Sequence, residues 1–231
     1  MGVQLKSSSL SPTVDHILDS RSHNSCLTLD AVQKFASRVK YLNLLLLSLM
    51  PERLCRGHLR RPLEADQLHT GNDGTAFYPS PINFKNATDG RPISFSTTFV
   101  FAIVPVYPNM SGHGIAFALA PSKELPGSMP SQYLGLFSKS DNGQASNHVV
   151  AVELDTVKSV DFADINANHV GIDVNDLKSV NASPVAYFDS REGVLKSLQL
   201  ISGEPMQVWV DYDGGEMKLG VMVAPLNKPK P

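Results

Sequence analysis

The sequence carries few charged residues and almost no net charge. Charged residues make up 18% of the 231 positions, below the usual quarter, and 20 Lys plus Arg stand against 22 Asp plus Glu. No basic field is therefore present to bind a phosphate backbone, and nucleic acid is not an expected partner. Gly and Pro number 16 each, which suits a fold of many strands and turns better than a helical bundle.

Cysteines and long apolar runs are also scarce. Cys26 and Cys55 both precede the part of the chain with a strand pattern, so a disulfide between them could not tie the expected core together. The stretch 1–20 has no apolar segment of the kind that a secretory signal contains. The apolar run at 41–50 is about half of the ~20 residues that a helix needs to cross a bilayer, so a membrane span is not expected.

The length suits one well-buried domain with appendages. Residues 1–65 differ in character from the remainder. Asp30 can cap a helix whose apolar residues recur at helical spacing as far as Leu49, and Pro51 ends it. We therefore expect an N-terminal extension over residues 1–65, helical or disordered, with one helix at 31–50.

From about residue 75 the apolar pattern changes to a period of two. The stretch PISFSTTFVFAIVP, residues 92–105, predicts a strand with one strongly apolar face. Further predicted strands cover residues 114–120, 148–156, 169–174, 194–201, 206–212 and 216–224. Asp213 and Gly214 predict a tight primed turn between the last two strands. Seven or more short strands separated by such turns indicate an all-β sandwich or jelly roll.

Metal-capable side chains gather in one segment, HVVAVELDTVKSVDFADINANHVGIDVN, at residues 148–175. Glu153 and Asp155 share one face of its first strand, with Cα atoms about 7 Å apart, and repel each other unless a cation intervenes. The following loop returns Asp164, and the next strand opens with His169. Oxygen ligands suit Ca²⁺, whereas His with carboxylates suits Mn²⁺ or Zn²⁺. The alternative is that these acidic residues are solvated turn formers.

Several stretches follow one another in a single order over about residues 66–231. They are AFYPSPINFKN, FSTTFVFAIVP, SGHGIAFALAPS, SQYLGLF, HVVAVELDT, DINANHVGIDVN and MQVWVDYDG. Together they resemble the legume (L-type) lectin domain, most closely the ectodomains of plant L-type lectin receptor-like kinases. The resemblance implies a concanavalin-like jelly-roll sandwich, truncated at both ends, and this chain is expected to lack its first and last strands. It also implies a glycan or other extracellular ligand, an extracellular or plasma-membrane location, and a homodimer through the back sheet.

The resemblance further implies paired Mn²⁺ and Ca²⁺ sites under a shallow carbohydrate pocket. The implied transition-metal ligands are Glu153, Asp155, Asp164 and His169. The implied calcium ligands are Asp155, Asp164, the backbone carbonyl of Val157, and a side-chain amide whose place Ser159 takes. A Ser hydroxyl is shorter than the Asn amide and a weaker ligand, so the calcium site is expected to be weak.

Two positions of the family's sugar pocket also depart from its pattern. Its aromatic platform falls on Val157, which offers a small aliphatic surface. Its Asp, which accepts hydrogen bonds from sugar hydroxyls after a cis peptide bond, falls on His113, and imidazole cannot replace a bidentate anion. Losing that Asp removes roughly 1.5–3 kcal/mol, against about 4 kcal/mol needed for millimolar affinity. We expect an impaired monosaccharide pocket, and a trans Gly112–His113 bond where calcium is weak.

Two other functions compete with a lectin. Glycoside hydrolases with a related jelly roll use the motif E-x-D-x-E or E-x-D-x-x-E. Glu153 and Asp155 match its opening, but Val157 and Lys158 stand where the second Glu is needed, so we do not expect an enzyme. The second alternative is a receptor ectodomain, or a fragment of one, for a non-sugar ligand.

Glycosylation sequons begin at three asparagines, Asn86, Asn109 and Asn181. The sequon at Asn181 is weakened by Pro184, which follows Ser183. Such tripeptides arise readily by chance, so they are candidates only.

Overall fold

The structure is a computed structural model. It describes residues 81–105, 107 and 111–230, together with the backbone of strands Gly2–Gln4, Asn24–Cys26, Tyr41–Ser48 and Thr75–Phe77. Within these ranges, no helix has the length and apolar character that crossing a membrane requires.

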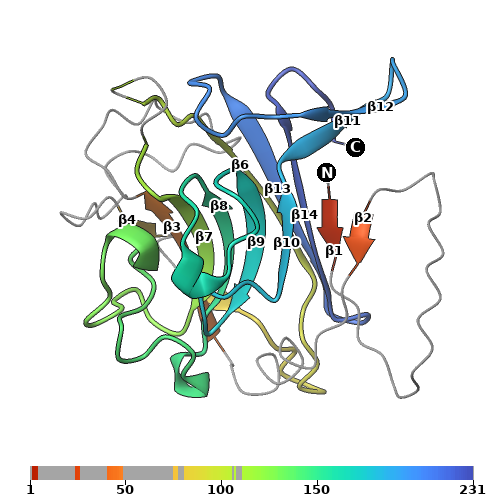
Figure 1. Cartoon of the computed structure of the whole chain (residues 1–231). Coiled ribbons are helices and arrows are strands. Elements are labelled where there is room, and N and C mark those ends of the chain that lie inside the picture. The colour runs from red at the N-terminus through yellow and green to blue at the C-terminus, as the bar shows by residue number, and fades with distance from the viewer. Residues whose placement is uncertain are drawn as a thin grey trace, which may run out of the picture.

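One layer of the molecule is a five-stranded sheet with the order β2-β1-β14-β13-β6 (Figure 1). Its strands are β1 (Gly2–Gln4), β2 (Asn24–Cys26), β6 (Phe95–Phe101), β13 (Met206–Asp213) and β14 (Lys218–Pro225). Antiparallel pairing joins β13 to both β6 and β14, whereas β1 and β2 run parallel to each other beside β14. We call this layer the back sheet.

The second layer, the front sheet, has the order β10-β9-β8-β7-β3-β4, and β5 also pairs with β3. Its strands are β3 (Tyr41–Ser48), β4 (Thr75–Phe77), β5 (Ile82–Asn83), β7 (Gly114–Ala120), β8 (Val150–Asp155), β9 (His169–Val174) and β10 (Asn181–Pro184). All of these pairings are antiparallel. β8 is therefore an interior strand, with β7 on one side and β9 on the other.

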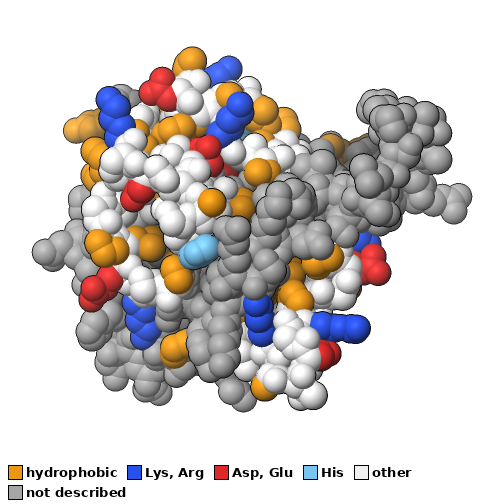
Figure 2. Space-filling model, turned by 90° about the horizontal axis from the view of Figure 1, so that it is seen from below, with side chains coloured by type: hydrophobic (Ala, Val, Ile, Leu, Met, Phe, Trp, Pro, Cys, Tyr) orange, Lys and Arg blue, Asp and Glu red, His pale blue; other side chains and the backbone are white. Residues whose placement is uncertain are grey.

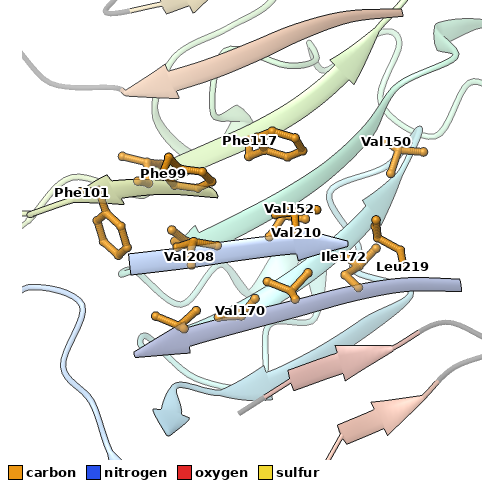
Figure 3. Close-up of a cluster of buried hydrophobic side chains, with 14 of the residues drawn as sticks. Phe99, Phe101, Phe117, Val150, Val152, Val170, Ile172, Val208, Val210 and Leu219 are labelled. Carbon is orange, nitrogen blue, oxygen red and sulfur yellow. The ribbon is translucent and has the colours of Figure 1, made fainter. Parts of the chain in front are cut away.

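The main core lies between the two sheets (Figure 3). Phe99 of the back sheet stacks on Phe117 of the front sheet, with ring centroids 5.9 Å apart. The inward side chains of β8 belong to this core; they are Val150, Val152 and Leu154. This confirms the prediction that alternate residues of this strand face opposite ways. Each such side chain contributes about 1.5–3 kcal/mol by leaving water.

A second core covers the outer face of the front sheet. Its members are Ala116, Ala118, Ala120, Leu134, Leu136, Phe137, Val149, Ala151, Phe162 and Leu177. The strand residues are small, so the large loop side chains can pack close to the sheet. The loops that supply them contain the short 3₁₀ helices η2 (Ser131–Tyr133), η3 (Ala145–Asn147) and η4 (Val160–Phe162). This second core lies on the same face of β8 as Glu153 and Asp155.

The predicted hairpin between the last two long strands is present, but its turn differs from the prediction. Asp213 pairs with Lys218, so four residues form the turn instead of a two-residue primed turn. Asp213 Oδ1 accepts the backbone N–H groups of Gly215 and Glu216 at 2.9 and 3.0 Å, and Met217 adopts a positive φ of 52°. This carboxylate stabilises the longer turn. A separate hairpin of β11 (Ala186–Asp189) and β12 (Val194–Ser197) lies outside both large sheets.

The predicted helix is wrong over residues 41–48, which form strand β3. A continuous run of leucines fits a fully paired strand as well as a helix, and periodicity cannot separate the two. Pairing with β7 on one side and β4 and β5 on the other decides in favour of the strand. The remainder of the predicted helix, 31–40, lies outside the described residues. The strands within residues 1–65 belong to both sheets, and the domain boundary near residue 66 stays a prediction, as does the lack of terminal strands.

Charged side chains of both signs are scattered over the described part of the face seen in Figure 2. Hydrophobic side chains lie among them. Seen from below, this face carries no region of a single charge sign among its described residues.

Candidate functional site

The candidate site is built around Glu153 on the interior strand β8. This side chain is buried, and its residue pairs with Ala116 of β7 and Gly171 of β9. A Cβ added at Gly171 would lie 2.3 Å from Glu153 Oε1 and 2.1 Å from Ser179 Oγ. The absence of a side chain at Gly171 therefore makes the room in which the carboxylate lies.

Asp155 and His169 lie side by side across the same pair of strands. They are directly paired between β8 and β9, so their side chains project from one face. His169 is fully buried, and its Nδ1 donates to the backbone carbonyl of Asn166 at 2.8 Å. Its Nε2 then points to Glu153 Oε1, 3.2 Å away. Metal-binding histidines are commonly oriented by this kind of N–H donation to a carbonyl.

The loop after β8 curls back and adds Asp164 to the cluster. The backbone N–H of Ser159 donates to Asp164 Oδ2 at 2.6 Å, and the turn is completed by Ala163 with a φ of 61°. Glu153, Asp164 and His169 can each offer one ligand atom, and these atoms all lie within 4.8 Å of one another. Two carboxylate oxygens and one imidazole nitrogen are a donor set suited to Mn²⁺ or Zn²⁺.

Asp155, the fourth predicted transition-metal ligand, does not belong to this close set. Its Oδ1 accepts the backbone N–H of Val157 at 2.7 Å. Burial, with the negative charge of Glu153 next in importance, raises the pKa of Asp155 to about 7. The Asp155 carboxylate is thus adjacent to the cluster, and a positive charge there would favour its ionised form.

Two polar residues of the site were not predicted. Ser179 Oγ lies 2.6 Å from Glu153 Oε1 and 2.7 Å from Asp173 Oδ1. A hydroxyl has one hydrogen and can donate it to only one carboxylate. Asp173 is fully buried, and this burial, together with the charge of Glu153, raises its pKa well above the usual value. A protonated Asp173 can donate to Ser179, which then donates to Glu153, so that all three groups are paired.

The remaining titratable groups of the cluster also respond to burial and to their neighbours. Burial raises the pKa of Asp164, whereas the hydrogen bond from Ser159 acts against that rise. Burial alone would lower the pKa of His169, but the hydrogen bond and charge of Glu153, with Asp155, raise it above its ordinary value. An excess of negative charge thus surrounds the imidazole, which is the electrostatic setting that a cation would relieve.

The predicted sugar-pocket residues lie along the loops next to this cluster. Burial lowers the pKa of His113, although Asp164 acts in the opposite direction, so the imidazole is neutral at pH 7. His113 Nδ1 lies 3.3 Å from Ser131 Oγ. Val157 is half-buried, and Ser159 is buried with its N–H on Asp164. No peptide bond among the described residues is cis, so the Gly112–His113 bond is trans.

The three sequons have different surroundings. Asn86 lies in an exposed loop. Asn181 lies on β10, and its Nδ2, the atom to which a glycan would be attached, is buried. Asn109 lies outside the described residues.

Two sheets packed face to face, with an acidic and histidine cluster beside an interior strand, define a β-sandwich protein with a candidate metal site. Residues 59–231 match the legume lectin domain family. The chain therefore belongs to the legume lectin domain family. That family generally binds Ca²⁺ and Mn²⁺.

Comparisons with individual proteins agree with this membership. The L-type lectin-domain containing receptor kinase IV.1 of Arabidopsis thaliana is 56% identical over 158 residues, which are 68% of this chain and 23% of the relative. The chain therefore spans about a quarter of the length of such relatives. Metal-free lectin I-B4 of Griffonia simplicifolia superposes with a TM-score of 0.53 at 28% identity, covering 66% of this chain and 60% of that one. Peanut lectin with a nine-residue peptide gives 0.53 and 28%, covering 65% and 58%.

Proposed function

We propose that this chain is a non-catalytic, metal-supported lectin domain whose ordinary monosaccharide pocket is impaired. The observation that carries the proposal is the cluster of Glu153, Asp164 and His169, with one ligand atom from each lying within 4.8 Å of the others. The metal ion that we assign to this cluster is Mn²⁺, which accepts both carboxylate and imidazole ligands. When bound, the ion would supply a fixed positive charge that holds the two carboxylates and the loop after β8 together.

Asp155 would join the transition-metal ligands when the ion is bound. Its carboxylate lies on the same face as Glu153 and His169, and a nearby cation favours its ionised form. Asp155 and Asp164 would also hold Ca²⁺, together with the carbonyl of Val157. Ser159 takes the place of the amide ligand, so we propose that calcium binds more weakly than manganese.

The impaired pocket is proposed from three neighbouring positions. A neutral His113 offers a single acceptor nitrogen, whereas the Asp expected there would offer two charged oxygens. Val157 gives a sugar ring no aromatic face to pack on. Ser159 cannot provide an amide donor. The ligand is therefore either a larger glycan that makes contacts beyond this pocket, or a molecule that is not a sugar.

A receptor ectodomain for a non-sugar ligand is the second candidate. The named Arabidopsis relative is a receptor kinase, and the peanut lectin structure contains a peptide. By analogy, we propose that this domain is displayed outside the cell or at its surface. The same altered residues, His113 and Val157, favour a ligand whose recognition does not require a carboxylate of the protein that accepts two hydrogen bonds.

Calorimetric titration of the full chain tests the metal site. Mn²⁺ is expected to bind the wild type, and E153Q is expected to weaken binding at least tenfold because one charged ligand is lost. D161N is the matched control, because Asp161 is an exposed acid in the same loop. Equal loss in both variants, or no binding to the wild type, would overturn the metal site.

The pocket is tested by adding mannose, glucose and galactose in saturating Mn²⁺ and Ca²⁺. No sugar is expected to bind with sub-millimolar affinity. The double substitution H113D and S159N restores two of the family's groups, and it is expected to strengthen binding of at least one sugar about tenfold or more. Sub-millimolar binding to the wild type would contradict the impaired pocket. A glycan array, with and without chelator, then separates a glycan ligand from a non-sugar ligand.

A further inference from the structure

The sequon at Asn86 lies in a short loop that backbone hydrogen bonds close. Asn86 N–H donates to the carbonyl of Arg91, and Gly90 N–H donates to the carbonyl of Asn86, both at 2.9 Å. Lys85 and Pro92 form a β-bridge at the base of the loop. The backbone on both sides of the sequon is thus held in place, while the tip points outward.

All three residues of the sequon, Asn86, Ala87 and Thr88, are exposed. Asn86 Oδ1 accepts the backbone N–H of Thr88 at 2.8 Å, which orients the side-chain amide. No hydrogen bond within the described part of the chain uses Asn86 Nδ2, so substitution at this nitrogen breaks none of the described hydrogen bonds.

The sequon at Asn181 provides the contrast. Asn181 pairs with Ile172, whose side chain is buried in the core between the sheets. Directly paired residues project from the same face of a sheet, so the Asn181 side chain also points toward the inter-sheet space. Its Nδ2 is buried, and a branched sugar there would force the sheets apart.

The Asn86 loop also lies far from the candidate metal site. β6 begins at Phe95 and ends at Phe101, after which the chain crosses to β7, whose first residue, Gly114, pairs with Asp155. The six residue steps from Phe95 to Phe101 span about 20 Å. This length separates the Asn86 loop, which precedes β6, from the end of the sandwich that carries the metal site. The loop instead borders the β13–β14 turn, since Gly214 N–H donates to Ser94 Oγ at 2.9 Å, and Figure 1 shows the yellow segment before β6 at that end of the sandwich.

We propose that Asn86 carries an N-linked glycan and that Asn181 does not. Asn86 Nδ2 forms a bond to C1 of the first sugar and loses a proton. The bond between C1 and the phosphate oxygen of a lipid-pyrophosphate-linked oligosaccharide breaks, and the lipid pyrophosphate leaves. The glycan shields the loop and the end of the back sheet without entering the metal cluster. The proposal depends on the proposed display of the domain outside the cell, because the oligosaccharide donor acts in the secretory pathway.

Expression of the full chain in plant cells tests the proposal. An added cleavable signal peptide directs the chain into the secretory pathway, and an appended sequon-containing tag reports entry. Peptide mass mapping is expected to find a glycan on the Asn86 peptide and none on the Asn181 peptide. N86Q and T88A are each expected to lose one glycan from the intact mass, T88S to retain it, and N181Q to leave the mass unchanged.

A glycosylated tag with a bare Asn86 would overturn the proposal, as would a glycan on Asn181. Calorimetric titration of N86Q with Mn²⁺ distinguishes a failure of the glycosylation proposal from a failure of the proposed metal site. Because the loop is remote from Glu153, N86Q is expected to bind Mn²⁺ with unchanged affinity. A loss of Mn²⁺ binding in N86Q would overturn the proposed placement of the glycan away from the metal cluster.

Discussion

At the residue scale, the candidate site brings several buried carboxyl groups close together. In the metal-free protein, these groups avoid buried negative charge by remaining protonated. Asp155 has a pKa of about 7, and Asp164 and Asp173 are shifted in the same direction. Burial is the largest cause for each of them. The carboxylates of this site therefore oppose folding when they are ionised without a cation.

This makes the stability of the metal-free protein depend on pH. Between about pH 4 and pH 7 Asp155 keeps its proton in the folded state and loses it in the unfolded state. The unfolded state then binds fewer protons, so the free energy of unfolding falls as the pH rises through this window. The contribution is on the order of a few kcal/mol. Urea unfolding in chelator at several pH values measures it.

The substitution D155N is the control for this pH dependence. It removes the titrating group, so the difference between wild type and variant reports Asp155 together with its interaction with Glu153. The wild type is expected to lose stability more steeply with rising pH than D155N does. Parallel curves for the two proteins would contradict the raised pKa.

A second residue-scale prediction concerns a buried hydroxyl in the back sheet. Tyr212 packs between Phe84 and Phe95, and its buried hydroxyl has no hydrogen-bond partner within the part of the chain that the structure describes. Burial, with the charge of Asp213 adding to it, raises the pKa of Tyr212 to about 12. Y212F is expected to leave the melting temperature unchanged or to raise it, since an unpaired hydroxyl costs about 1–3 kcal/mol.

The hydroxyl of Thr98 offers the matched comparison for Tyr212. It donates to the Val208 carbonyl at 2.8 Å and accepts from Gln207 Nε2 at 2.9 Å. T98V is expected to destabilise the protein by about 1 kcal/mol because paired groups are left without partners. If Y212F were the more destabilising of the two in thermal melts, the Tyr212 hydroxyl would have to be paired.

At the scale of elements, the turn between β13 and β14 depends on the close approach of two backbones. A Cβ added at Gly214 would lie 2.2 Å from the Pro92 carbonyl oxygen, whereas one added at Gly215 would lie 3.3 Å from a side-chain oxygen of Asp213 and would meet no backbone atom at closer range. G214A is therefore expected to lower the free energy of unfolding by about 1–3 kcal/mol. G215A, one residue away, is expected to cost less than about 1 kcal/mol. Urea titration of the two variants distinguishes them, and equal losses would contradict the close approach at Pro92.

The strands could be predicted from the sequence where apolar and polar residues alternate clearly. β7 and β9 have the predicted bounds, and the two faces of β8 divide between the two cores as expected. The same period predicted that Glu153 and Asp155 share a face. β10 was not predicted because Asn, Ser and Pro conceal its pattern, and β11 was not predicted because its four residues are too few to show an alternation. The strand at 41–48 was mistaken for a helix because leucine favours helices and its sheet partners are distant in sequence.

The sequence predicted only those residues of the site that lie close to one another along the chain. Asp164 and His169 follow β8 within one loop and one strand, and the structure brings both beside Glu153. Ser179 and Asp173 were missed as parts of the site because their contacts depend on the register of β9 and the path of the loop after it. Gly171 was missed for the same reason, since only the pairing with Glu153 explains why a side chain is excluded there.

At the scale of the whole molecule, the two cores have separate functions. The core between the sheets holds the sandwich together, whereas the core on the outer face of the front sheet fixes the loops around the cluster. Leu177 belongs to the outer core and lies two residues before Ser179, which contacts Glu153. Leu219 belongs to the core between the sheets and lies on the back sheet.

Equivalent truncations in the two cores should therefore separate stability from metal binding. L177A and L219A each remove a buried leucine, 1% and 2% exposed, and each is expected to cost about 2–5 kcal/mol of unfolding free energy. Only L177A is expected to weaken Mn²⁺ binding, by about tenfold, because the loop that carries Ser179 loses its support. Denaturant unfolding and Mn²⁺ calorimetry on the same samples measure both effects. Equal Mn²⁺ affinities in the two variants would mean that the metal cluster is held by the front sheet alone, without the loops packed on its outer face.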